Sequence, residues 1–236
     1  RMKYVVIADE IGNPIYFDHA DGRMLCLLLV TTQDLFNENF YERVNMLSCG
    51  RMRIVFEQHG SLSFMIASDQ GECERLLRNQ LQLLYELLLM VFGPHALHER
   101  KQLNFLRYRE LIQHLVDTTN HLSDTEIAFL VQSVEQLEIN DEIQEKFTAA
   151  LKTGLIAVPS TSHALLFVGN KLCATYTKPK AWPLNPLDTH LLLLYIRSQF
   201  TPVVKQHERR ELPVADYTDH ADVLAGNDTA AAAAAA

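Results

Sequence analysis

Alternating apolar and polar residues predict a set of short strands in the first third of the chain. Each run is rich in β-branched or aromatic residues, and glycine-containing turns separate the neighbouring runs. The predicted strands are residues 3–9, 15–18, 44–49, 53–58 and 62–67. Because strands joined by tight hairpins pair antiparallel, the sequence predicts a five-stranded, mainly antiparallel sheet.

A strongly apolar segment, residues 24–41, follows the first hairpin. The run from Met24 to Val30 contains no polar residue, so its length, rather than its periodicity, favours a helix over a buried strand. Such a helix is apolar all round over two turns. One face can cover the sheet, while the rest must be buried by something else. Two alternatives remain open: burial within the same chain, and burial against another protein.

The longest predicted helix follows the fifth strand and covers residues 69–92, with leucines recurring at steps of three and four. Asp69 is placed to cap its start, and Glu72 to complete a capping box. Gly93 and Pro94 are placed to end it. The element order is therefore ββαβββα, which predicts an α/β (α+β) domain over residues 1–94.

Helical patterns dominate residues 95–154, which we predict to be a helical connector. The spacing of apolar residues predicts a first helix over 103–116. Ser123 to Glu126 has the sequence of a capping box and predicts the start of a second helix. Asn140 is placed to cap a third helix, which Gly154 is expected to end.

Strand patterns return after the connector. Residues 164–177 predict a second hairpin around a Gly-Asn turn, and Asn185 is placed to cap a helix with another all-apolar run. This order of elements repeats that of residues 3–41. We therefore predict a second, incomplete unit of the same kind over residues 155–229. The alanine tail, Ala230 to Ala236, is interpreted as residues of unassigned identity and left out of the fold.

Composition excludes several classes of function. The net charge is −8 and the isoelectric point about 5.7, which argues against nucleic acid or anionic lipid as the main partner. The four cysteines lack metal-ligand or redox spacing and are expected to be reduced thiols in a cytoplasmic protein. No secretory signal is evident, and no apolar run approaches the ~20 residues of a membrane span.

Motifs of chemical catalysis are missing from the sequence. None of the nine glycines stands in a phosphate-binding pattern, and no Gly-x-Ser-x-Gly motif is present. His95 and His98 lie three residues apart beside Glu99, but without further ligands they are expected to be surface histidines. Asp188 at the start of a helix is expected to stabilise the helix dipole. We therefore predict no catalytic residue, no metal site and no cofactor.

Several short motifs resemble the tri-longin family of Rab exchange-factor subunits. Lys3 to Val6 and the Gly12 to Tyr16 turn are similar to the family's opening strand and its Gly-Lys-Pro-Ile-Tyr turn. Asn185 to Leu192 resembles the second unit, where the family has His-Pro-Ile-Asp-x-His-Leu-Leu. Further similar segments are Ile54 to Phe56, Leu62, Gln80 to Tyr85 and Asn170 to Leu172. The resemblance spans residues 3–203, and no single motif in it is diagnostic.

The sequence departs from the family pattern at several positions. Asn13 replaces the family's lysine, and Asn185 replaces its histidine. The third unit and most of the second have no counterpart here. The resemblance implies the longin fold for the ββαβββα units, the second of them incomplete.

The resemblance also implies a function. It implies one subunit of a heterodimeric guanine-nucleotide exchange factor for a Rab GTPase, without a bond-making active site. The implied partners are a second longin-domain subunit and the GTPase. The complex would be recruited from the cytoplasm to endosomal or lysosomal membranes, or those of lysosome-related organelles. The alternative is a scaffold, tether or planar-polarity effector subunit without exchange activity.

In such exchange factors the first longin units of two subunits pair and form the platform on which the GTPase docks. We therefore predict the interface on the helix over residues 24–41. The candidate interface residues are Leu25, Leu27, Leu28, Val30, Thr31, Gln33 and Asp34. If Leu25, Leu28 and Leu29 pack inward, then Leu27, Val30 and Thr31 point outward. The all-apolar run does not fix the phase, so the opposite assignment stays open.

Overall fold

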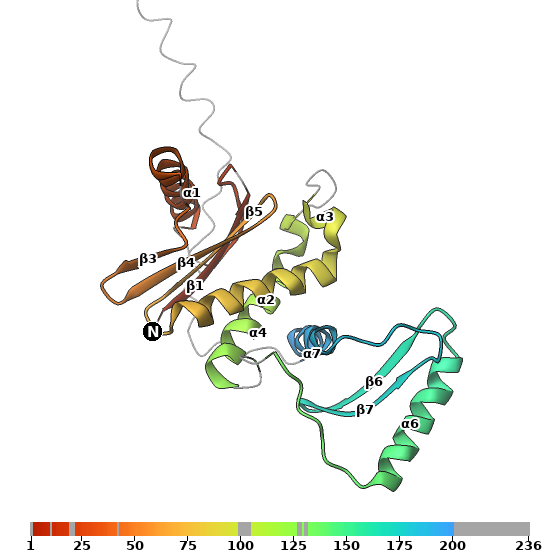
Figure 1. The fold of residues 1–236 in the computed structure, drawn as a ribbon. Helices are drawn as coiled ribbons and strands as arrows, with labels where there is room; N and C mark the ends of the chain where they lie inside the picture. Colours follow the sequence, from red (N-terminus) through yellow and green to blue (C-terminus); the bar gives the residue numbers. More distant parts are fainter. Residues whose placement is uncertain are drawn as a thin grey trace, which may run out of the picture. The chain divides into compact units, whose positions relative to one another are not determined.

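The first part of the chain forms an α/β unit with one sheet between helices, as the computed structural model shows (Figure 1). The structure describes residues 2–9, 11–18, 22–41, 43–98, 105–126, 129 and 132–200. Of residues 22, 23, 25, 28, 29, 98, 105 and 106 it describes only the backbone. The described residues all fall within one compact unit, residues 1–203.

Five strands form the sheet in the order β2-β1-β5-β4-β3, and every pairing is antiparallel. The strands are β1 Lys3–Asp9, β2 Pro14–Phe17, β3 Met46–Cys49, β4 Met52–His59 and β5 Leu62–Ser68. The predicted element order ββαβββα and the longin-like fold are thereby confirmed. The first strand, β1, lies between β2 and β5, so the N-terminal segment is paired on both sides.

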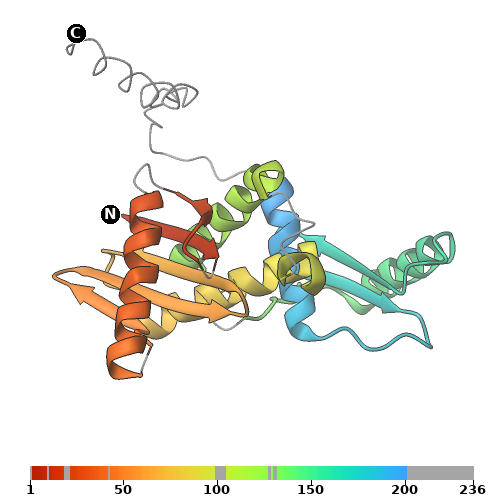
Figure 2. The ribbon, with the colours of Figure 1, turned by 90° about the horizontal axis from the view of Figure 1, so that it is seen from above.

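Alternation along β1 divides the core into two layers. Val5 and Ile7 point to the face covered by α2, Glu74–Phe92, whereas Val6 and Ala8 point to the face covered by α1, Gly22–Phe40 (Figures 1 and 2). On the α2 side the core also contains Leu77, Leu81, Leu84, Leu88, Ile112, Leu115 and Val116. On the α1 side, Cys26 is the one described helix residue in the buried cluster.

The start of α2 differs from its prediction. The helix begins at Glu74 after Cys73, which makes no side-chain cap, so the capping box from Asp69 to Glu72 is wrong. Asp69 instead accepts a hydrogen bond from the backbone N–H of Met2 at 2.7 Å. Asp69 and Glu72, which could cap the helix, instead bind Met2 and Lys3 at the start of the chain. The predicted end is confirmed, because Gly93 lies at the C-cap with φ of 77°.

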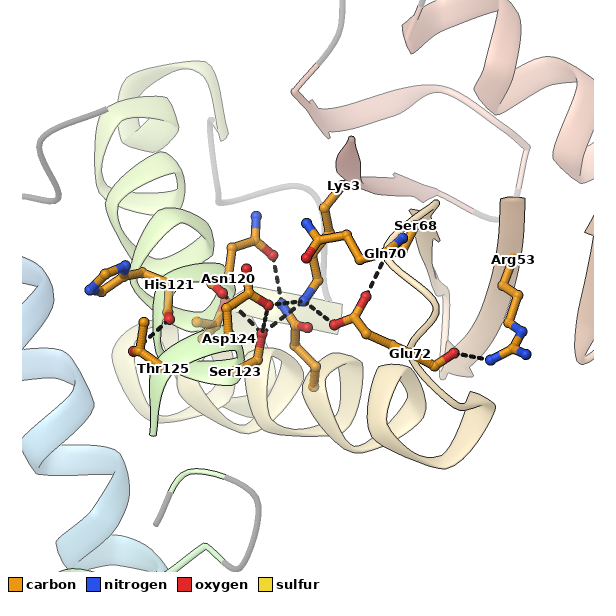
Figure 3. Close-up of polar contacts among 12 residues, drawn as sticks. Lys3, Arg53, Ser68, Gln70, Glu72, Asn120, His121, Ser123, Asp124 and Thr125 are labelled. Atoms are coloured by element: carbon orange, nitrogen blue, oxygen red, sulfur yellow. Dashed lines mark hydrogen bonds and ion pairs between the residues drawn. The ribbon is translucent and has the colours of Figure 1, made fainter. Parts of the chain in front are cut away.

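A buried ion-pair network joins three segments that are far apart in the sequence (Figure 3). The Lys3 ammonium donates to Glu72 Oε1 at 2.6 Å, Ser123 Oγ at 2.7 Å and Asp124 Oδ1 at 3.3 Å. The Lys3 side chain is only 5% exposed and that of Glu72 11%. Glu72 is also bonded to Ser68. The network therefore fastens the end of α4, Arg109–Thr125, to the start of β1 and the loop after β5.

The predicted helix start at Ser123 to Glu126 is also wrong. These residues form the last turn and C-cap of α4, and Glu126 donates its backbone N–H to the Leu122 carbonyl. Ser123 is buried at Lys3, and its hydroxyl also donates to the Asn120 carbonyl at 2.9 Å. A sequence that is typical of a helix start therefore lies at a helix end, where Ser123 binds Lys3 of a distant strand. Residues 127, 128, 130 and 131 of the predicted stripe lie outside the described residues.

The second hairpin and the helix after it follow the predicted order, whereas the connector differs from its prediction. The helix predicted over 103–116 is α4, which begins later, at Arg109, and continues to Thr125, and the short helix α3 was not predicted. The elements are α3 Pro94–His98, a 3₁₀ turn η1 Phe105–Tyr108, α6 Asp141–Ile156, β6 His163–Val168, β7 Lys171–Thr177 and α7 Pro186–Phe200. Asn140 caps α6 by accepting from the Glu142 N–H at 3.0 Å, as predicted. The predicted end at Gly154 is wrong, because α6 continues through Gly154 to Ile156. Residues 201–236 lie outside the described residues.

Helix α7 packs on the first unit rather than standing apart from it. Its leucines Leu191 and Leu194 form a buried cluster with Leu83 and Leu87 of α2 and Leu122 of α4. At the edge of this cluster Arg197 forms an ion pair with Glu126, at 2.8 and 2.9 Å to the two carboxylate oxygens.

His190 is buried at the same junction and meets the Phe129 ring edge-on. Burial lowers the pKa of this histidine below 6.5, although a backbone hydrogen bond at Gln132 and the charge of Glu126 oppose the shift. The unfolded chain therefore binds a proton more readily here than the folded one. This junction loses stability as the pH falls through the ordinary range of a histidine.

Candidate interaction surface

The β1–β2 turn sets the position of the predicted interface helix. The buried carboxylate of Asp9 accepts hydrogen bonds from the Ile11 N–H at 2.9 Å, the Asn13 N–H at 2.7 Å and the Asn13 side-chain amide at 2.9 Å. Between them Gly12 takes a φ of +88°. A Cβ at Gly12 would lie 3.3 Å from the Val30 side chain, so α1 rests directly on this turn.

We expect the Gly12→Ala variant to be less stable by about 1–3 kcal/mol, because it combines a positive φ with a close contact to α1. Urea unfolding at equilibrium measures the change. Gly71→Ala is the matched control, since Gly71 has a φ of +85° and nothing within 4 Å of its Cβ position. Equal losses in both variants would contradict a role of Gly12 in seating α1.

The inner face of α1 is defined by residues four and three apart. Cys26 is buried against the sheet, while Val30 and Gln33 are half-buried. The Gln33 side-chain amide donates to the Val44 carbonyl, and its oxygen accepts from the Val44 N–H at 3.2 Å. Burial raises the pKa of the Cys26 thiol to about 11, so this cysteine is held as an unreactive thiol.

A pocket of about 260 Å³ remains between α1 and the sheet. Its floor is apolar, and polar side chains line its mouth, among them Asp34, Arg43 and Gln58. The other lining residues are Val6, Ala8, Cys26, Val30, Gln33, Val44, Asn45, Phe56, Glu57, Ser63, Phe64 and Met65. This volume lies below the ~300–1,000 Å³ of typical small-molecule sites.

The outer face of α1 carries exposed apolar side chains. Met24 is 67% exposed, Leu27 60% and Leu35 58%. With Thr31, which is also exposed, they recur at steps of three and four residues and form one stripe along the helix. At ~1.5 Å per residue the 19-residue helix is about 29 Å long, so the stripe extends over most of that length. We call Met24, Leu27, Thr31 and Leu35 the outer stripe.

The structure distributes the predicted interface residues over both faces. Leu27 and Thr31 lie on the outer stripe, and the Thr31 hydroxyl donates to the Leu27 carbonyl. Val30 and Gln33 lie on the inner face, and Asp34 is exposed at the mouth of the pocket. The side chains of Leu25 and Leu28 lie outside the described residues.

Sequence reasoning missed the second half of the surface. Leu35, Phe36, Phe40 and Tyr41 are all exposed, and the rings of Phe36 and Phe40 lie 5.4 Å apart. Leu35 could have been found by extending the spacing of Met24, Leu27 and Thr31 by four residues. Polar residues 31–34 and 37–39 separate these aromatic residues from the apolar run that ends at Val30, so a search for the most apolar run does not include them.

The chemistry of this surface suits binding to a protein. Among the described residues no group of three histidine, cysteine or carboxylate side chains is placed to hold a metal ion. His95 is exposed, and the side chain of His98 lies outside the described residues. Exposed leucines, aromatic rings and a small apolar pocket with a polar mouth are features of protein interfaces.

Comparison with known proteins places the fold in a family. A family model described as the first longin domain of FUZ, MON1 and HPS1 matches residues 3–122, just over half of the chain. The matched region contains the complete sheet, α1, α2 and nearly all of α4. The resemblance to the tri-longin family is thereby confirmed. Among its members the motifs favour the Mon subunit of the Mon–Ccz complex, then the larger Hermansky–Pudlak exchange subunit, then Fuzzy.

Several relatives are vacuolar fusion proteins. The chain is 26% identical over 202 residues to vacuolar fusion protein MON1 of Yarrowia lipolytica, covering 81% of this chain and 36% of the relative. It is 25% identical over 226 residues to MON1 of Saccharomyces cerevisiae, covering 84% and 33%. The Arabidopsis thaliana homolog is 32% identical over 93 residues, covering 39% and 15%.

The chain spans about a third of the length of the fungal relatives that it matches. Its five-stranded antiparallel sheet, with α1 on one face and α2 on the other, agrees with the matched family model. The chain therefore belongs to the family of the first longin domain of FUZ, MON1 and HPS1.

Proposed function

We propose that the chain is a subunit of a heterodimeric longin-type guanine-nucleotide exchange factor. It acts on a Rab GTPase in endosomal or lysosomal trafficking, or on lysosome-related organelles. The observation that carries the proposal is the longin domain itself, together with relatives named as vacuolar fusion proteins. The proposed partners are a second longin-domain subunit and the GTPase.

The outer stripe supports a role in assembly. A helix of a monomeric protein normally turns its apolar residues inward, but α1 leaves Met24, Leu27 and Leu35 more than half exposed. The pocket beside the helix offers room for an apolar side chain of a partner, with Asp34 and Arg43 at its mouth to fix polar contacts. We propose that α1 and the pocket together form the partner surface.

Such a subunit makes and breaks no covalent bond. An exchange factor binds the nucleotide-free GTPase more tightly than the loaded one. Thermodynamic linkage then requires that it weaken the affinity of the GTPase for nucleotide by the same factor. The chain needs a shaped surface for this task rather than acids, bases or metal ligands. The outer stripe and the pocket provide surface of that kind.

We also propose that β6, β7 and α7 begin a second longin domain, after a first one over residues 1–94 and a connector over 95–154. Their order repeats β1, β2 and α1. In the first sheet, β1 pairs with β5 along the edge away from β2. The corresponding edge of β6 pairs with no strand among the described residues. A two-stranded sheet is marginal by itself, so this edge suits a further strand of the same domain.

The proposed site of action is a membrane surface. Among the described residues, no helix is both long and apolar enough to cross a bilayer. We propose that the complex is recruited from the cytoplasm to the surface of endosomal or lysosomal membranes. The names of the fungal relatives support this location.

We expect the purified complex of this chain with its longin partner to accelerate release of fluorescent GDP from one member of a Rab panel. Rab proteins outside that pair serve as internal controls. Unchanged release across the whole panel would contradict exchange activity and favour a scaffold or tether subunit. The experiment is done in solution without membranes, so that recruitment does not enter the rate.

A further inference from the structure

His190 of α7 is buried with one ring nitrogen unsatisfied. The residue is only 2% exposed, and its Nδ1 atom has no hydrogen-bond partner among the described residues. The ring is hydrogen-bonded to the backbone of Gln132, so this bond is made by the other nitrogen, Nε2. The neutral tautomer with its proton on Nε2 fits this site, because it donates to the Gln132 carbonyl and leaves only a lone pair on Nδ1.

The positively charged form of His190 does not fit the same site. Protonation puts an N–H on Nδ1, where the described part of the chain offers no acceptor, and a buried charge also loses its hydration. The Phe129 ring gives little compensation, because the two ring centroids are 6.3 Å apart and the rings are perpendicular. A cation–π attraction needs the cation within ~6 Å of the centroid and over the ring face.

The nearest carboxylate is already neutralised. Glu126 is the charged group that favours protonation of His190, but it accepts from the Arg197 guanidinium at 2.8 and 2.9 Å and from the Asn170 amide at 2.9 Å. Of the charged groups in the described ranges, only Glu126 acts on the ring. The other titratable groups on the elements around it are Glu86 of α2, His121 and Asp124 of α4, Asp188 of α7 and the Lys171–Glu135 pair beside β7.

The same contacts connect α7 and the second hairpin to the end of α4. Asn170 lies in the β6–β7 turn and Arg197 on α7, and both hold Glu126 at the C-cap of α4. Gln132 has a φ of +51°, which is costly for a residue with a side chain, and it leads into residues 135–137, which pair with β7. We call His190, Gln132, Glu126, Arg197 and Asn170 the latch.

We propose that the latch is a pH-sensitive switch, closed when His190 is neutral and open when it is protonated. In the open form α7 and the β6–β7 hairpin separate from α4, while the five-stranded sheet stays folded. The sheet has its own core, and the Lys3 network holds the end of α4 to it without any residue of the latch. This inference goes beyond the proposed function, because it concerns how β6, β7 and α7 are held rather than what they bind.

The direction of the response follows from burial. Burial lowers the pKa of His190 below 6.5 in the closed form, and a ring released into water returns to its ordinary value. The open form therefore binds the proton more readily. The closed form keeps its full advantage above pH 6.5 and loses it as the pH falls below that value. One pH unit lower, the equilibrium constant for opening has risen by up to about tenfold.

Amide hydrogen exchange of the full chain, corrected for the intrinsic effect of pH on exchange, measures this opening. We expect the protection of amides in α7 and β7 to fall severalfold, up to about tenfold, between about pH 7.5 and about pH 5.5. Amides in β1 and β5 are expected to keep their protection. Equal protection of α7 at both pH values overturns the proposal. A loss of the same size in β1 and β5 overturns it too, because the whole fold would then be opening.

Two variants separate protonation from packing. His190→Gln keeps a side-chain donor for Gln132, His190→Leu keeps an apolar side chain, and neither titrates. We expect both to abolish the pH response of α7. His163→Gln is the matched control and is expected to retain it, because His163 contacts Thr177 at 3.0 Å at the end of the hairpin opposite Asn170. A full pH response in both His190 variants overturns the proposal.

Nuclear magnetic resonance titration of the His190 ring in the unmodified chain needs no variant. We expect its midpoint to lie below pH 6.5, and a midpoint at or above that value overturns the proposal. These measurements use the chain without a GTPase or a longin partner. Their outcome is therefore independent of whether the complex accelerates release of GDP.

Discussion

The Leu27→Asp variant is expected to lose binding to the longin partner or to the GTPase while remaining folded. Leu27 is 60% exposed on the outer stripe, so a charge at this position stays hydrated in the free chain. Burying a leucine at an interface contributes about 1.5–3 kcal/mol, which corresponds to an affinity change of about 10- to 150-fold. The unpaired aspartate adds a desolvation cost to this loss. Co-purification with the partner and titration of the GTPase measure the effect.

Two control variants accompany this experiment. Leu27→Ala removes the side chain without adding charge, and we expect it to bind with intermediate affinity. Val168→Asp adds the same charge at an apolar residue that is 51% exposed at the end of β6, outside the proposed surface. Wild-type yield of the complex with Leu27→Asp would refute the interface. Loss of folding would show that α1 is buried within its own chain.

Lys3→Met is expected to destabilise the fold by about 3–5 kcal/mol, because it leaves Glu72 charged and buried without its partner. The Ser68 hydroxyl remains to satisfy part of the carboxylate, and Asp124, which is 39% exposed, can hydrate. Urea or thermal unfolding measures the loss of free energy.

The double variant Lys3→Met/Glu72→Leu distinguishes a lost ion pair from lost packing. We expect it to be more stable than Lys3→Met alone, because it removes the uncompensated charge together with its partner. Lys171→Met is the matched surface control, since the Lys171–Glu135 pair at 2.9 Å has both side chains about half exposed. It is expected to cost no more than about 1 kcal/mol. Similar losses for Lys3→Met and Lys171→Met would contradict the structural role of the buried network.

The predicted fold followed from local patterns wherever one physical cause dominated. Strands β1 and β5 alternate because each face of the sheet is buried against a helix, and α2 carries leucines at steps of three and four because it covers one face. The turns at Gly12, Gly50 and Gly60 need positive φ angles, which glycine adopts without strain. Such features depend only on residues that are close together in the sequence, so they can be predicted from it.

Helix capping failed where tertiary contacts competed for the same side chains. Asp69 and Glu72 have the sequence of a capping box, but the Met2 N–H and the Lys3 ammonium bind them instead. Ser123 and Glu126 have such a sequence too, yet Ser123 binds Lys3 and Glu126 binds Arg197. A capping bond is worth about 1 kcal/mol, and a buried charge left without its partner costs several times more. The tertiary contact is therefore the more stabilising of the two, and it determines which partner each of these side chains binds.

The sequence by itself determined the ββαβββα order of the first unit, its five antiparallel strands, the end of α2 and the family, because these depend on periodicity, turn residues and short motifs. Only the tertiary structure decided the phase of α1. In an all-apolar run every face of the helix is equally suited to burial, so the sequence does not say which one packs on the sheet. The contact of Val30 with the β1–β2 turn and the hydrogen bonds between Gln33 and Val44 fix the face that points inward. The tertiary structure also decided which charged side chains are buried. Lys3 meets partners 69 and 121 residues away, and no local pattern encodes contacts between residues so far apart.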